Sequence, residues 1–128
     1  MDPQQELFTE IRDILNRMYD GRVYDGFMPP EGTPYPFIYI ADTRQDDVAS
    51  KGAIFGYISV DLHIWHNDPM ERGTVSEIAL RIKQAVRKLE STANFGFSLS
   101  SMTQRLLHDD TTSQPLLHCI LEFRFHFS

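Results

Sequence analysis

Hydrophobic and polar residues alternate through the middle of the chain, from Ile58 to Trp65. The apolar positions are Ile58, Val60, Leu62 and Ile64, and the positions between them are Ser59, Asp61, His63 and Trp65. A period of two is typical of a strand that is buried on one face. The pattern predicts a long strand over Ala53–His66, with Gly56 marking a bulge or bend that divides it.

Two other segments carry apolar residues at spacings of three and four, which indicates amphipathic helices. In the first, Pro3 suits a helix start and Gly21 suits a C-terminal cap. In the second, Thr74 and Glu77 have the spacing of a capping box, which predicts a helix start at that point. The first stripe contains Leu7, Ile11, Ile14 or Leu15, and Met18, and the second contains Val75, Ile78, Ala79, Ile82, Val86 and Leu89.

The remaining segments predict short strands and turns. Arg22–Tyr24 reads as a short edge strand, and an apolar run from Phe37 to Ala41 reads as a central one. Asp42–Gly52 is polar and is predicted to be a long loop. Phe95–Thr103 and Pro115–Phe127 are predicted to form a hairpin. The order of elements predicts a single α+β domain over 1–128, with a mainly antiparallel sheet of about four to five strands and two helices packed on one face.

Composition narrows the class of protein. Apolar residues make up 41% of the chain and charged residues 23%, which is ordinary for a globular protein. The apolar runs are too short to cross a bilayer, and the first residues are acidic, so we expect no membrane association and no secretory signal. The single cysteine, Cys119, excludes an intrachain disulfide, and its apolar neighbours predict a buried thiol.

The net charge of −6 argues against a protein that binds nucleic acid through its phosphates, because such binding needs a cluster of basic residues on one surface. It does not exclude a protein past which DNA slides, because an acidic channel would repel the phosphates.

The histidines are the first candidates for a metal or acid–base site. On a strand, His63 and His66 point to opposite faces and cannot share a metal without a bulge. His63 shares its face with Asp61 and Trp65, and the polar face of the last strand carries His118, Glu122, Arg124 and His126. If the two strands pair, these side chains form a polar patch, which is either a solvated or subunit-facing surface or a metal or acid–base site.

The chain has paired carboxylates but no recognisable catalytic motif. Asp46–Asp47 and Asp109–Asp110 both lie in predicted loops, where solvated turn charges are the simpler interpretation. No glycine-rich phosphate loop or nucleophile elbow is present. We therefore expect neither an enzyme nor a bound cofactor. Trp65 either packs structurally beneath the following turn or contributes to a protein interface, where aromatic residues are enriched.

Two blocks, Pro34–Asp47 and Val60–Val86, carry a resemblance to a known family. A strand of the "PFIYI" type leads into a polar loop that contains Arg44. A second strand ends in Trp65-His66, and a turn with Gly73-Thr74 leads into a helix. In order and content these blocks resemble the tail-completion and head-to-tail-joining proteins of tailed bacteriophages.

The resemblance implies a small α+β protein that forms a ring, commonly a hexamer. Such a ring completes or terminates the tail and joins it to the head-side connector, with DNA passing through but not specifically bound. Its partners would be its own copies, the tail-tube protein and head-completion proteins, and it would be found in the virion after assembly in the bacterial cytoplasm. The implied contact residues are Arg44, Asp46, Asp47 and Lys51, in an interface or channel loop, and Trp65 and His66 at a strand end.

Two alternatives come from other classes. A small-molecule- or protein-binding α+β module would need polar groups between the helices and the sheet. A hydrolase or metal enzyme would use the outward histidines. The polar surface also predicts that the protein is monomeric or weakly associated in isolation.

Overall fold

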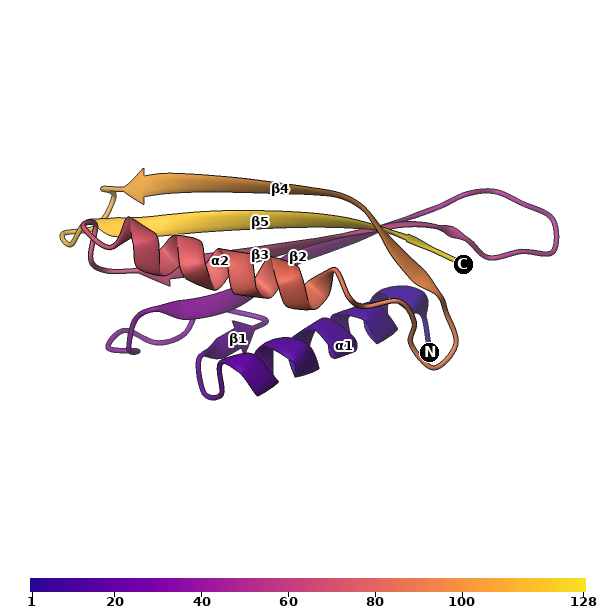
Figure 1. The fold of residues 1–128 in the computed structure, drawn as a ribbon, viewed down its shortest axis with the longest axis horizontal. Helices are drawn as coiled ribbons and strands as arrows, with labels where there is room; N and C mark the ends of the chain where they lie inside the picture. The colour runs from indigo at the N-terminus through magenta and orange to yellow at the C-terminus, as the bar shows by residue number, and fades with distance from the viewer.

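The computed structural model describes residues 1–128 as two helices and one five-stranded sheet. The elements are α1 (Pro3–Met18), β1 (Val23–Asp25), β2 (Phe37–Asp47), β3 (Gly56–His66), α2 (Arg72–Val86), β4 (Phe97–Asp109) and β5 (Leu116–Phe127). Across the sheet the order is β1-β2-β3-β5-β4, and only β1 and β2 run parallel. Both helices lie against the same face of the sheet (Figure 1). The predicted α+β class is confirmed.

We call the helix-covered side of the sheet the inner face and the opposite side the open face. The period-two pattern decides which side chains lie on each. On β3 every residue with an even number from Ile58 to His66 is buried on the inner face, and the residues between them are half-buried on the open face. The alternation predicted for this segment is therefore confirmed, although the strand begins at Gly56 rather than at Ala53.

Helix α1 begins and ends much as its sequence predicts. The Asp2 carboxylate accepts a hydrogen bond from the backbone N–H of Gln4 at 3.0 Å, and Pro3 occupies the first turn. This satisfies one of the donors that a helix start leaves unpaired. Gly21, with a φ of 76°, follows the C-terminal cap at Tyr19.

Helix α2 begins at Arg72, two residues earlier than the predicted capping box. Glu71 stands at the N-cap position without a side-chain hydrogen bond to the helix. Glu77, which a capping box would turn back toward the helix start, instead accepts a bond from Arg81 one turn later at 2.9 Å. The capping-box prediction is wrong because Thr74 already lies within the helix, where it cannot act as the N-cap, and Glu77 pairs with Arg81 instead.

The predicted loop Asp42–Gly52 is wrong over its first half, because β2 continues to Asp47. Between Ile40 and Thr43 a bulge places two residues of β2 opposite Asp61 alone, and beyond it the strand pairs with β3 again. The segment is polar because its inner side chains meet the start of α1 rather than the core. Gln4 Nε2 donates to Thr43 Oγ1 at 2.7 Å, and the Gln4 backbone N–H donates to Gln45 Oε1 at 3.1 Å.

The last hairpin is also longer than predicted. β4 runs on to Asp109, since Gln104–Asp109 pair with Leu116–Leu121 of β5. β4 is an edge strand, and apart from Phe97, Leu99, Leu106 and Asp109 its side chains are exposed on both faces. Its sequence therefore lacks the clear alternation of a covered strand. The turn residues that the sequence signals are confined to Asp110–Pro115.

The core lies between the inner face and the two helices. Its largest fully buried side chains are Phe123, Phe125, Phe127, Leu7, Ile11, Leu15, Ile40, Ile58, Leu62, Ile64, Ile82 and Leu117. Ile14, Met18 and Ile78, which the helical stripes place in the core, are only partly buried. Of the two alternatives Ile14 and Leu15, it is Leu15 that is fully buried. Cys119 is buried as predicted, and burial raises the pKa of its thiol. Neither helix has the length and apolarity needed to cross a membrane.

Candidate functional site

The centre of the open face holds an aromatic–histidine cluster, made of Tyr39, His63, Trp65 and His118. The Trp65 and His118 rings stack with centroids 3.7 Å apart at an angle of 11°. His118 Nε2 and His63 Nδ1 are 2.7 Å apart, and Tyr39 meets His63 edge-on at 6.3 Å. The cluster exists because β3 pairs with β5 on one side and with β2 on the other, which places Trp65 opposite His118 and His63 opposite Tyr39.

The two histidines of the cluster are held in the neutral form. Burial, and secondarily the nearby His63, lowers the pKa of His118 to about 4. Burial also lowers the pKa of His63. The 2.7 Å contact therefore joins two neutral rings, one donating an N–H and the other accepting it. The indole N–H of Trp65 is buried and has no partner among the protein atoms.

An acidic group borders the cluster. Asp61 lies opposite Glu122, and burial raises the pKa of Asp61, with further contributions from Glu122 and Asp42. Acids and histidines thus share one surface, as the sequence predicted for paired strands. No three of the histidine, cysteine, aspartate and glutamate side chains are arranged to hold a metal ion.

Farther along β3 and β5, the open face carries an arginine and more aromatic rings. The Arg124 guanidinium lies 4.3 Å from the centre of the Tyr57 ring, and His126 meets the same ring at 5.4 Å. Tyrosine, tryptophan and arginine are the residues most enriched in the energetic centres of protein interfaces. The open face therefore has the chemistry of a contact surface.

The four residues predicted for an interface or channel loop lie on one projecting hairpin. Arg44, Asp46 and Asp47 are in β2 rather than in a loop, and Lys51 is in the turn beyond it. Arg44 Nε donates to Asp46 Oδ1 at 3.1 Å, and Gln45 Nε2 donates to Asp47 Oδ1 at 2.7 Å. All four predicted residues are thus in one region, although only Lys51 belongs to a loop.

The tip of this hairpin extends beyond the rest of the molecule, past the C-terminus (Figure 1). Val48 donates its backbone N–H to the carbonyl of Phe55 at 2.9 Å, which closes the turn. Within the turn, Ile54 is 66% exposed. The projecting turn therefore presents one strongly exposed apolar side chain.

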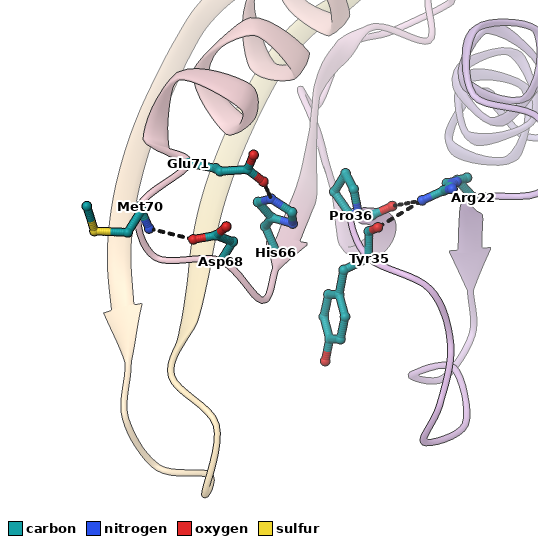
Figure 2. A network of polar contacts seen from close by, with 7 residues as sticks. All are labelled: Arg22, Tyr35, Pro36, His66, Asp68, Met70 and Glu71. Atoms are coloured by element: carbon teal, nitrogen blue, oxygen red, sulfur yellow. Dashed lines mark hydrogen bonds and ion pairs between the residues drawn. The ribbon is translucent and has the colours of Figure 1, made fainter.

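Trp65 and His66, predicted together as an interface strand end, point to opposite faces. Trp65 belongs to the open face, whereas His66 is 6% exposed on the inner face. His66 Nε2 and Glu71 Oε1 are 2.7 Å apart, and the ring donates because the carboxylate can only accept (Figure 2). His66 therefore anchors the turn before α2, and an interface role for it is not supported by its burial.

Around this turn, backbone groups are held by further polar side chains (Figure 2). Asp68 accepts a hydrogen bond from the Met70 backbone N–H at 2.9 Å. Arg22 Nη1 donates to the carbonyls of Tyr35 and Pro36 at 3.0 and 3.1 Å. These contacts fix the loops at the end of the molecule opposite the projecting hairpin.

A groove of about 670 Å³ lies between these loops. It is lined by residues 28–35 on one side and 112–114 on the other, with Phe37, Asn67 and Leu116 completing it. Nearby, Phe27 is 81% exposed and Met28 is 47% exposed. The proline spacing in this segment signalled turns, and no pattern in the sequence showed that the turns would border a groove.

The layer between helices and sheet contains two buried polar residues, Glu6 and His66. Glu6 is held by protein groups, whereas His66 bonds to Glu71 through Nε2 and its buried Nδ1 has no partner among the protein atoms. Glu6 accepts hydrogen bonds from Thr92 Oγ1 at 2.6 Å and from Asn94 N and Nδ2, and these bonds lower its pKa. The small-molecule alternative needs a polar group in this layer that is free to bind a ligand, and the Glu6 carboxylate is not free.

Sequence reasoning missed several members of the open face. Tyr39 and Tyr57 were not singled out, although both follow from the alternation once β2, β3 and β5 are paired. The link from Glu6 to Asn94 could not be found in the same way. It joins residues 88 positions apart, and neither lies in a recognisable motif.

No protein-family model matches the sequence, and a comparison with curated proteins finds no match. Among solved structures, the fold is similar to a chain in a structure described as the virion of a native gene transfer agent particle. The TM-score is 0.64 at 12% sequence identity, and the match covers 97% of this chain and 94% of that chain. At this identity the likeness establishes the fold alone.

Proposed function

We propose that the protein is a structural component of a tailed-phage or phage-like virion. In this role it completes or terminates the tail and joins it to the head-side connector. The observation that carries the proposal is the likeness of fold, over nearly the whole of both chains, to a chain of a gene transfer agent virion. The blocks Pro34–Asp47 and Val60–Val86, which resemble tail-completion proteins, support the finer role.

The proposed assembly is a ring, a hexamer in the virion. A ring needs head-to-tail contacts between subunits, related by a rotation that closes on itself. The hairpin with Arg44, Asp46, Asp47 and Lys51 extends far enough from the body to reach a neighbouring subunit or line a channel. The open face, with Trp65, supplies a second surface for the tail-tube or head-completion proteins.

DNA passes through the proposed ring without being bound specifically. The net charge of −6 supports this part of the proposal, because an acidic wall repels phosphates and does not trap the strand. The proposal includes no catalysis, no cofactor and no membrane partner. It places the protein in the virion after assembly in the cytoplasm of the host.

Gene deletion and complementation in a phage or prophage that encodes the protein test the proposal. Without the protein we expect heads and tails to accumulate separately, with infectious or transducing yield lost. Tails of uncontrolled length would assign the terminating role, and tails of normal length would assign the joining role. Antibody labelling should place the protein at the head–tail junction. Normal particles from the deletion strain, or purified particles that lack the protein, would contradict the proposal.

A further inference from the structure

The sheet ends in two edges that are free for different reasons. β4 pairs only with β5, so its outer side has no partner over the whole strand. At the other side of the sheet, β1 covers Ile38–Ile40 of β2 and leaves Thr43–Asp47 without a second neighbour. Each edge presents backbone N–H and C=O groups that a further strand can pair.

The β4 edge has little of the protection that free edges usually carry. Sheet edges are commonly shielded by charged residues, by proline or by irregular pairing. From Ser98 to His108, the formal charge at pH 7 comes from Arg105 alone, and the segment contains no proline. A bulge lies between Leu99 and Ser101, after which the pairing with β5 is regular to Asp109.

Apolar surface accompanies this edge on both faces of the sheet. Met102 on the inner face is 38% exposed, and Leu107 on the open face is 36% exposed. A groove of about 330 Å³ lies between the start of α2 and β4, and its lining includes Val75, Leu106 and Cys119. The layer of helices therefore stops short of the edge, where an added strand and its helix would complete the cover.

The directions of the strands make the two edges complementary. β2, β3, β5 and β4 alternate in direction, so β2 and β4 run opposite to each other. When two copies lie side by side with their inner faces on the same side, β4 of one copy therefore meets β2 of the next in antiparallel orientation. The rows of paired residues that cross the sheet place Arg44 level with Ser101, but they also place Ile40 and Ile38, which β1 covers, level with Gln104 and Leu106. An added β4 must therefore be offset along the strand, so that its end near Asp109 lies beside Thr43 and clears β1.

We propose that the β4 edge of one copy pairs with Thr43–Asp47 of β2 in the next, so that the sheet continues from subunit to subunit. The contact is heterologous and uses both free edges of every copy. This inference deepens the proposed ring, and closure of the ring rests on the proposed function. A two-fold pairing of β4 with β4 would leave both β2 edges free, and it is the principal competing arrangement.

Cysteine cross-linking of the purified protein tests the pairing. Arg44→Cys is combined in turn with Arg105→Cys, Leu107→Cys and Asp109→Cys, which all lie on the open face and cover shifts of two residues along the strand. Each double variant is treated with a mild oxidant over a range of concentrations, and the products are separated without reductant. Oxidation traps contacts that are too weak to give a stable oligomer.

We expect at least one double variant to give a ladder of covalent dimers, trimers and larger products, with the corresponding single variants remaining monomeric. Arg44→Cys with Gln84→Cys, on the exposed side of α2, is the matched control for random collision. A dimer from any β4 single variant, or no ladder beyond the control from all three pairs, would overturn the proposal. Thermal unfolding of each variant confirms that it is folded.

Particle incorporation is scored separately. A ladder from a protein that is absent from particles would support the edge pairing and reject the virion role. Absence of the ladder from a protein that is essential for particles would reject the edge pairing and leave the virion role standing.

Discussion

The two faces of one sheet have opposite character. On the inner face, β5 presents only apolar side chains and Cys119, and all of them are buried. On the open face, the same strand presents His118, Glu122, Arg124 and His126, with the apolar Ile120 among them. A difference of one position along the strand thus separates residues that hold the fold together from residues that meet solvent or another protein.

This difference shows where substitutions should change stability and where they should change assembly. A buried aromatic or aliphatic side chain contributes about 1.5–3 kcal/mol by leaving water. Cross-strand pairs on a half-exposed face contribute about 0.2–1 kcal/mol each. The open face can therefore vary its chemistry at small cost to the fold, and we expect contacts with other molecules to be concentrated there and on the projecting hairpin.

The largest expected effect comes from the layer that covers the inner face. Ile82→Ala in α2 should lower the free energy of unfolding by about 2–5 kcal/mol, because Ile82 is fully buried and the change leaves a cavity. Leu80→Ala is the matched control on the same helix, since Leu80 is 45% exposed and should lose far less. Urea unfolding measures both. A loss below about 1 kcal/mol for Ile82→Ala would show that the helix packs less tightly than described.

The inner face was the part of the molecule that the sequence predicted best. The apolar residues recur every second position on β3 and every third or fourth position on the helices. These spacings identify the side chains that become buried, and their burial drives folding. The errors fall where burial is partial. The edge segments Thr43–Asp47 and Gln104–Asp109 are strands because a neighbour pairs with their backbones, and backbone pairing leaves no apolar signal in the side chains.

The hairpin offers the next largest effect. Gly56→Ala should lower the free energy of unfolding by about 1–3 kcal/mol, because the added methyl group would overlap the backbone carbonyl of Asp46. Gly73→Ala in the first turn of α2 is the control, because its methyl group meets no atom within 4 Å. We expect that control to be neutral or stabilising, since alanine favours the helix. Equal stability of Gly56→Ala and the original protein would mean that β2 and β3 are not so closely paired at this end.

The histidines of the open face predict a smaller, pH-dependent effect. The pKa of His118 is lowered from 6.5 to about 4, so the folded state favours the neutral ring. Above pH 6.5 neither state binds this proton, and the stabilisation is fully present. As the pH falls toward 4 the unfolded state takes up the proton first, and stability is lost. Solvent screens the half-buried ring, so the expected loss in the free energy of unfolding is about 1–2 kcal/mol, less than the full pKa shift would give.

His118→Gln should remove part of this loss, and His108→Gln, at an exposed position on β4, should leave it unchanged. Urea unfolding across this pH range makes the comparison. His63 acts in the same direction, because its pKa is also lowered. Asp61 acts in the opposite direction, because its pKa is raised and its protonation favours the folded state as the pH falls. A proton NMR titration that places His118 near 6.5 would contradict the account.

For the candidate site, the sequence predicted which side chains share a face of the sheet, but not which of them are in contact. Alternation correctly separated His63 from His66 and grouped His63 with Trp65. The partners of these residues depend on strand register, which is set by the whole sheet rather than by local spacing. For that reason the stack of Trp65 on His118 and the bond from His66 to Glu71 were visible only in the structure.

The smallest effect on stability is expected at the hairpin tip, where the effect on assembly should be largest. Replacing Ala49–Ile54 with a Gly/Ser segment of the same length should change the free energy of unfolding by less than about 0.5 kcal/mol, because these side chains are exposed and touch no core residue. Hydrogen exchange should be fast in this segment and slow in the part of Thr43–Asp47 that pairs with β3.

In a complementation assay, the same replacement should abolish incorporation into particles, because the proposed neighbour would lose the arm that reaches it. Ile54→Ser is the narrower companion variant. It keeps the length and charge of the turn and removes its most exposed apolar side chain, so a partial loss of yield would assign the contact to that residue. Full infectious yield from the Gly/Ser replacement would show that the tip is dispensable. Contacts between subunits would then have to come from the sheet edges and the open face.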